Sequence, residues 1–216
     1  MSAVVTTAAP EIVIEQRVVL HNISWEAYEV LMKSHEDRSA PRFTFDNGEL
    51  EIYMPTQPHE QAAEFLKSFV KVVAEEREIN VLGLGSTTFR SKAVDKGVEP
   101  DGCFYVQNYD RVFKVEKIDL ENDPPPDLII EVDITSPSID RFPIYAKFEA
   151  PEIWRFENEK VKVLLLQNNE YAEAAESSAL PKVTGEVLTE FLAASQTEKQ
   201  LVWLKRVREW ARANPV

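Results

Sequence analysis

Hydrophobic and polar residues recur along the 216-residue chain with two different periods, and the change of period marks the expected elements. Alternation with a period of two predicts a strand over 12–20 and a hairpin over 42–54, which turns at Asn47-Gly48 because this dipeptide favours a tight reversal. A spacing of three to four predicts a helix that begins after the N-cap Ser24 and runs to Met32. The same spacing predicts a longer helix over 59–78.

The second half of the chain carries shorter apolar runs. They predict strands over 82–90, 102–106 and 128–134, of which the last is apolar enough to be a central strand covered on both faces. A polar stretch over 107–123 reads as either an ordered lid or a flexible loop. Further elements are expected as a helix opened by Ser136, a hairpin with strands over 160–166 and from 171 onward, and helical segments through 188–192 and 201–210.

This order of elements predicts an α/β (α+β) fold. A mixed central β-sheet is flanked by helices, with an N-terminal helix and hairpin before it and a C-terminal helix after it. We expect a flexible N-terminus over 1–11, one domain over 12–195, and a C-terminal amphipathic helix over 196–216 that packs on the core or on a partner subunit. The stripe of Trp203 and Trp210 on that helix favours a docking or homodimer surface over a base-stacking platform.

Charge and cysteine content narrow the class of protein. The net charge of −13 and the pI of about 4.8 work against non-specific binding to nucleic acid, although a local basic groove can exist on an acidic protein. The single cysteine, Cys103, is expected to be buried and inert and fits a reducing, cytoplasmic location. No apolar run approaches the roughly 20 residues that span a bilayer, so we expect no membrane association.

Three carboxylates carry the candidate chemistry. Asp101 follows Pro100, and 30 residues later a strand presents Glu131 and Asp133 on one face, because side chains alternate along a strand. Two carboxylates on so apolar a strand are costly unless a cation compensates them. One interpretation is a site in which Asp101, Glu131 and Asp133 hold Mg²⁺ or Mn²⁺ for phosphodiester hydrolysis. The alternative is that Asp101 merely ends a strand and Glu131 pairs with a buried arginine.

Several ordered segments resemble one known family. The order of helix, hairpin, strand ending in Pro-Asp and strand with Glu-x-Asp resembles the restriction-endonuclease-like superfamily named for its PD-(D/E)XK motif. A closer resemblance, over roughly 20–195, is to the bacterial Uma family of proposed endonucleases, long treated as a domain of unknown function. The segments that carry it are 48–55, His59, 99–101, 126–132, 136–138, Tyr145 and 151–154. The resemblance implies a metal-dependent endonuclease with Asp101 and Glu131 in its centre.

One expected lysine is missing. The superfamily's lysine falls at Asp133 here, and in the Uma family it comes four residues before the tyrosine that matches Tyr145, where this chain has Arg141. Arginine can bind a phosphate but cannot act as a base, because its pKa is too high. Lys147 could substitute only if its helix presents it to the site. The alternative function is therefore a catalytically degenerate nuclease fold that serves as a binding or assembly module.

Basic residues could provide the nucleic-acid contacts. A strip of Arg90, Lys92, Arg141 and Lys147 beside Asp101 would favour the enzyme, whereas an acidic surround would favour the module. His59 opens the long helix, where the helix N-terminus could bring it near a phosphate, although a capping or surface role is the more ordinary reading. The resemblance makes nucleic acid the expected partner, with DNA favoured over RNA.

Overall fold

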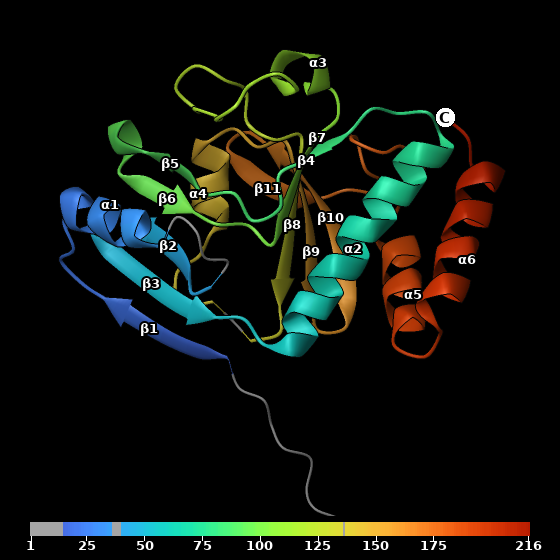
Figure 1. Ribbon diagram of the computed structural model, residues 1–216, viewed down its shortest axis with the longest axis horizontal. Helices are drawn as coiled ribbons and strands as arrows, with labels where there is room; N and C mark the ends of the chain where they lie inside the picture. Colours follow the sequence, from blue (N-terminus) through green and yellow to red (C-terminus); the bar gives the residue numbers. More distant parts are fainter. Residues whose placement is uncertain (1–14, 36–39, 136) are drawn as a thin grey trace, which may run out of the picture.

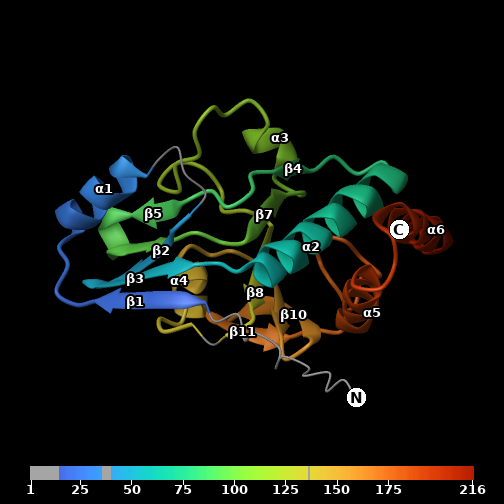
Figure 2. The ribbon, with the colours of Figure 1, turned by 60° about the horizontal axis from the view of Figure 1, so that its bottom comes forward.

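A computed structural model describes residues 15–35, 40–135 and 137–216. They form two β-sheets and six α-helices, with a 3₁₀ turn at Lys92–Val94 (Figures 1 and 2). The predicted α/β class is confirmed. The expected flexible segment 1–11 and the start of the first predicted strand lie outside the described residues. Among the residues described, no helix is long and apolar enough to cross a membrane.

The first sheet contains five antiparallel strands. In spatial order they are β1 (Gln16–Leu20), β3 (Glu49–Met54), β2 (Arg42–Asp46), β6 (Lys96–Val98) and β5 (Phe89–Ser91). Strands β2 and β3 are the predicted hairpin, and Asn47 and Gly48 take positive φ values of 48° and 88°, as a tight reversal requires. Helix α1 (Trp25–Ser34) covers one face of this sheet, and the Ser24 side chain accepts a hydrogen bond from Ala27 N as predicted.

The second sheet contains six strands. Their order is β11 (Glu170–Glu173), β10 (Lys160–Gln167), β9 (Glu152–Glu157), β8 (Leu128–Asp133), β7 (Gly102–Tyr105) and β4 (Leu82–Gly83). Strand β8 is central, as predicted. It pairs in parallel with β9 and antiparallel with β7, and all six of its residues are buried. The sheet is therefore mixed.

Helices cover both faces of the second sheet. Helix α2 (Gln57–Glu76) lies across one face beside α5 (Gly185–Ser195), and α6 (Gln200–Ala213) packs on these two helices (Figure 1). The short α4 (Phe142–Lys147) packs with the core of the opposite face. Helix α3 (Tyr109–Val112) lies in the polar stretch expected over 107–123. Helix α2 begins two residues before the predicted start because Pro58 fits the first turn.

Three expectations from the sequence are wrong. The run 82–90 is not one strand: β4 joins the second sheet and β5 the first, because the chain crosses between the sheets around Gly85. The helix expected to open at Ser136 begins only at Phe142, and Ser136 itself lies outside the described residues. Trp203 is not on a docking surface. It is 1% exposed and packs against Phe65, because α2 offers an apolar face to α6.

Candidate active site

The two predicted carboxylates Asp101 and Glu131 lie at neighbouring strands. Asp101 immediately precedes β7, next to the Gly102–Ile130 pair that ends the β7–β8 ladder, and Glu131 follows Ile130 in β8. Backbone contacts fix the position of Asp101, since its N–H donates to Ile130 O at 3.1 Å and its Oδ2 accepts from Val132 N at 2.7 Å. The sheet therefore brings the two carboxylates together.

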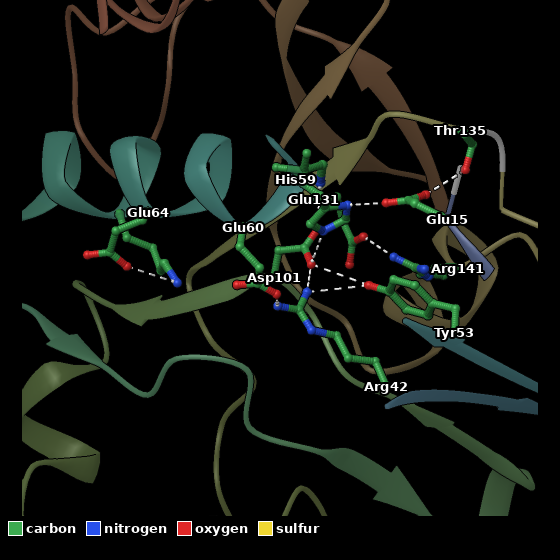
Figure 3. A network of polar contacts seen from close by, with 12 residues as sticks. Glu15, Arg42, Tyr53, His59, Glu60, Glu64, Asp101, Glu131, Thr135 and Arg141 are labelled. Atoms are coloured by element: carbon green, nitrogen blue, oxygen red, sulfur yellow. Dashed lines mark hydrogen bonds and ion pairs between the residues drawn. The ribbon is translucent and has the colours of Figure 1, made fainter. Parts of the chain in front are cut away.

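His59 connects Asp101 to a third carboxylate. Its Nε2 lies 2.7 Å from Asp101 Oδ1 and its Nδ1 lies 2.7 Å from Glu15 Oε1, and the ring is fully buried (Figure 3). His59 is thus neither a surface nor a capping residue. The first turn of α2 carries it into the site.

Arg141 pairs with Glu131. Its Nη1 donates to Glu131 Oε2 at 2.5 Å, while the Tyr145 hydroxyl donates to the other oxygen of the same carboxylate. Burial lowers the pKa of Arg141, but the charge of Glu131 outweighs this effect and holds the pKa well above its ordinary value. Burial and the same carboxylate raise the pKa of Tyr145. Arg141 is therefore a permanent cation, and Tyr145 remains a hydrogen-bond donor.

A second arginine, Arg42, pairs with Asp101. The Arg42 guanidinium contacts Asp101 Oδ1 and also donates to Glu60 Oε1 at 2.5 Å. The Arg42 side chain is 4% exposed, whereas the Glu60 side chain is 45% exposed. Because Asp101 also accepts from His59 and Val132 N, both of its oxygens are occupied.

Glu51 and Tyr53 extend the same cluster from β3. Glu51 Oε1 lies 3.0 Å from Arg17 Nη1 and 3.6 Å from Arg141 Nη2. The ring centroid of Tyr53 lies 4.6 Å from the guanidinium carbon of Arg17 and 4.7 Å from that of Arg141. Such cation–π contacts are strongest when they are desolvated. The ring of Tyr53 therefore helps to hold both arginines beside the carboxylates.

The other predicted site residues are held by partners outside this cluster. Asp133 shares a face with Glu131, but its partner is Arg155 of β9, at 2.8 Å from Oδ2 to Nε. Lys92 pairs with Glu26 on the surface. Arg90 lines a cavity of about 270 Å³ with Glu99 and Lys117, and the exposed Lys147 lines a separate groove beside Glu149. The structure therefore does not gather Arg90, Lys92 and Lys147 into one strip, and their contact with nucleic acid stays a prediction.

Sequence reasoning missed several members of the cluster. Glu15, Arg17, Arg42 and Tyr53 were not expected there. The available signal was alternation: Glu51 and Tyr53 share one face of β3, opposite the apolar face of Leu50 and Ile52. Arg17 interrupts an apolar strand in the same way. A charged residue at such a position indicates a buried partner.

The carboxylates of the cluster are the right kind of ligand for a divalent ion, but few of them are placed to bind one. Mg²⁺ is often bound through one or two carboxylates, with the remaining ligands supplied by water and substrate phosphate, and Asp101 and Glu131 meet that requirement. Over the described ranges, no group of three or more His, Cys, Asp or Glu side chains is placed to hold a metal ion. The protein would therefore supply two carboxylates at this centre, and Asp133 would not be a third ligand.

Comparison with known proteins places the chain in a family. Residues 25–195 match the model of the family described as "Putative restriction endonuclease" (Uma2), which is more than half of the chain. The chain belongs to this family, as the sequence resemblance predicted, and so to a class of nucleases.

The chain also resembles a protein of known structure. The fold is similar to the crystal structure of a "putative nuclease belonging to DUF820" from Anabaena variabilis, with a TM-score of 0.46 and 15% identity. The match covers 70% of this chain and 92% of that one. No curated protein matches the chain.

Proposed function

We propose that this protein is an endonuclease that hydrolyses phosphodiester bonds of nucleic acid at the cluster around Asp101 and Glu131. One observation carries the proposal: four residues from separate parts of the sequence meet in one buried centre. His59 lies 2.7 Å from Asp101, and Arg141 lies 2.5 Å from Glu131. Burying so many charges is costly for stability, and such clusters concentrate at functional sites. Membership of the endonuclease family supports the same reaction class.

Mg²⁺ or Mn²⁺ is the proposed cofactor, and Asp101 and Glu131 are the residues that would hold it. When bound, the ion would supply the charge that neutralises the scissile phosphate. The other residues position these two carboxylates. His59 and Val132 N fix Asp101, and Tyr145 fixes Glu131. Arg141 would contact the phosphate as a cation, since its raised pKa prevents it from acting as a base.

DNA is the proposed substrate, in keeping with the description of the family. The choice of DNA over RNA, a homodimer and a cytoplasmic location stay predictions. The net charge of −13 requires that any contact with nucleic acid be local, because the protein as a whole repels phosphate. We therefore expect cleavage to weaken only modestly as salt rises, because the salt dependence of binding scales with the number of phosphates contacted and only a few are contacted here.

Cleavage of supercoiled plasmid DNA in Mn²⁺ tests this proposal. The wild type should nick the plasmid, and Glu131→Gln should abolish nicking. Because this change unpairs the buried Arg141, circular dichroism and thermal unfolding must show that the variant is folded at the assay temperature. Asp133→Asn is the matched control from the same strand, because Asp133 pairs with Arg155 outside the cluster, and it should still cut. A single-stranded RNA run in parallel decides the substrate class. Equal activity of the wild type and Glu131→Gln would overturn the assignment of the site.

The second candidate is a degenerate nuclease fold that serves as a binding or assembly module. One specific observation favours it: the oxygens of Asp101 and Glu131 are already paired with protein donors, and both residues are nearly inaccessible. A wild-type protein that neither nicks plasmid nor binds Mn²⁺ would establish this alternative.

A further inference from the structure

A groove outside the cluster around Asp101 and Glu131 lies between the end of α1 and the segment that leads into β5. Part of it is a cavity of about 270 Å³, which is lined by the hydroxyl residues at 86–88 and by Arg90, Glu99 and Lys117. Among the described residues that line this cavity, none belongs to the cluster. Convergent polar groups of this kind fix the orientation of a ligand in a binding site.

Two cations of this cavity lack an acidic partner. Lys92 and Lys96, which follow β5, pair with Glu26 and Asp46. Within the ranges that the structure describes, the cavity residues Arg90 and Lys117 have no such pair. Acidic residues outnumber basic ones by 37 to 24 in this chain, so cations left unpaired beside a cavity indicate a site for an anion.

A second hollow adjoins the first. It has a volume of about 290 Å³, shares the two cations and Thr88 with the first, and adds apolar walls from Ile118 and Leu120. Asp119 also lines it, but both oxygens of this carboxylate accept hydrogen bonds within its own loop. Together the two hollows fall within the range of roughly 300–1,000 Å³ that is typical of small-molecule sites. The groove therefore has room for a ligand that carries more than an anionic group.

Glu99 gives the groove an acceptor for N–H groups. Its Oε2 accepts from Phe43 N at 2.8 Å, and its Oε1 accepts from the Thr88 hydroxyl at 2.6 Å. An ionised carboxylate has about four lone-pair sites, so each oxygen of Glu99 can accept one more hydrogen bond. Glutamate is a known partner of the amino group of cytosine. The groove thus combines an acceptor for a base with cations for a phosphate.

We propose that this groove binds a nucleotide whose base carries an amino group, such as a cytidine nucleotide. Arg90 and Lys117 bind the phosphate, and Glu99 accepts a hydrogen bond from the amino group of the base. The apolar walls of the second hollow contact the remainder of the ligand. This site lies outside the cluster around Asp101 and Glu131, so the inference goes beyond the proposed function and does not rest on it.

Calorimetric titration with cytidine 5′-monophosphate tests the proposal. The buffer contains EDTA, so that no metal-dependent cleavage occurs. Uridine 5′-monophosphate is the matched ligand, because a carbonyl replaces the amino group and would face the carboxylate of Glu99. The wild type should bind the cytidine nucleotide roughly fivefold or more tightly than the uridine nucleotide, and inorganic phosphate more weakly than either.

Variants assign the two halves of the ligand to their residues. Arg90→Gln should weaken binding of both nucleotides by roughly tenfold, because a charge-assisted hydrogen bond to the phosphate is lost. Lys117 is exposed, so Lys117→Gln gives the same test without risk to the fold. Glu99→Gln should bind both nucleotides with similar affinity. Lys92→Gln is the control, since Lys92 does not line the groove, and it should bind as the wild type does.

A single-stranded tetranucleotide of deoxycytidine distinguishes two sources of the same chemistry. Tighter binding than the mononucleotide identifies a segment of a strand as the ligand, and equal binding identifies a free nucleotide. Thermal unfolding checks that each variant is folded.

Three results would overturn the proposal: no binding of the cytidine nucleotide by the wild type, equal affinity for the cytidine and uridine nucleotides, or equal affinity for inorganic phosphate and the nucleotide. Equal affinity of the wild type, Arg90→Gln and Lys117→Gln would overturn the assignment of the groove. Plasmid nicking by a wild type that binds no cytidine nucleotide would remove this site and leave the proposed function standing.

Discussion

His59 Nε2 lies 2.7 Å from Asp101 Oδ1, and neither side chain is accessible to solvent. The other ring nitrogen faces Glu15 at 2.7 Å, so one imidazole links strand β1 to the carboxylate beside strand β8. The first sheet, helix α2 and the second sheet thereby meet at a single polar centre. Its stability depends on pairing, because each charge is buried where an unpaired one is costly.

Removal of the Asp101 charge should destabilise the protein strongly. Asp101→Asn removes the buried carboxylate that faces Arg42 and His59 and leaves Arg42 only the half-exposed Glu60, so the free energy of unfolding should fall by about 3 kcal/mol. Urea denaturation measures the change. In the control Asp133→Asn, Arg155 keeps its contact with Glu157 at 2.8 Å, so the loss should stay near 1 kcal/mol or less. Equal losses in the two variants would contradict a special role for the cluster.

The aromatic ring of Tyr53, rather than its hydroxyl, should account for most of its contribution to the free energy of unfolding. Tyr53→Phe keeps the cation–π contacts with Arg17 and Arg141. It loses two long hydrogen bonds, one to Asp101 at 3.4 Å and one from Arg42 at 3.3 Å, so we expect a loss of about 1 kcal/mol. Tyr53→Leu removes both aromatic contacts and should cost about 2 kcal/mol or more. If the two variants unfold at the same urea concentration, the ring is not what holds the arginines.

Two buried glutamates should give stability opposite pH dependences. Burial raises the pKa of Glu15, but hydrogen bonds from His59, Thr135 and Arg17 outweigh it and lower the pKa from 4.5 to about 2. Glu15 therefore stabilises the protein above about pH 4.5, and this contribution is lost as pH falls toward 2. Burial raises the pKa of Glu99 above its ordinary value of 4.5. The contribution of Glu99 to stability is therefore full below that pH and is lost as the pH rises through the raised pKa.

Matched glutamine variants separate these two effects. Glu15→Gln should be less stable than the wild type at pH 7, and the difference should shrink in acid. Glu99→Gln should match the wild type near pH 4 and become relatively more stable toward pH 7, because the cost of ionising Glu99 is removed. Thermal unfolding between pH 3 and 7 measures both differences. Parallel pH profiles for the two variants would contradict the assigned environments.

Trp203 should be essential to the fold and irrelevant to assembly. Its ring centroid lies 5.0 Å from that of Phe65, and its Nε1 donates to Phe191 O at 2.6 Å. Trp203→Ala should lower the free energy of unfolding by about 3–5 kcal/mol. On α6 the exposed Leu201 offers a control, and Leu201→Ala should change stability little. A large effect of Leu201→Ala on oligomeric state in light scattering would instead place a subunit contact on this helix.

Strong periodic patterns predicted the elements that build the site. The apolar run over 128–134 gave the central strand β8, and the Asn47-Gly48 turn gave the β2–β3 hairpin, because burial and turn geometry are local signals. The run 82–90 was wrongly predicted to be one strand, because the sheet that a strand joins is decided by partners far away in the sequence. The β4 and β5 segments pair with different strands, and nothing within the run announces the change.

The motif and the strand alternation named Asp101, Glu131 and Arg141, and the fold brings these three residues into one buried cluster. Their role in catalysis stays a prediction. Arg17 and Arg42 could not be placed from the sequence, because their partners lie 34 and 59 residues away and charged side chains are usually solvated. The three-dimensional pairing, rather than any local pattern, decides which arginine neutralises which carboxylate.

Anomalous diffraction tests the proposed centre most directly, from crystals grown with Mn²⁺ and a short DNA duplex whose phosphorothioate linkages resist cleavage. We predict one Mn²⁺ peak in contact with oxygens of both Asp101 and Glu131, with Arg42 and Arg141 turned away from these carboxylates. A map without that peak while the duplex is bound, with both arginines still paired as in the free protein, would contradict the proposed centre.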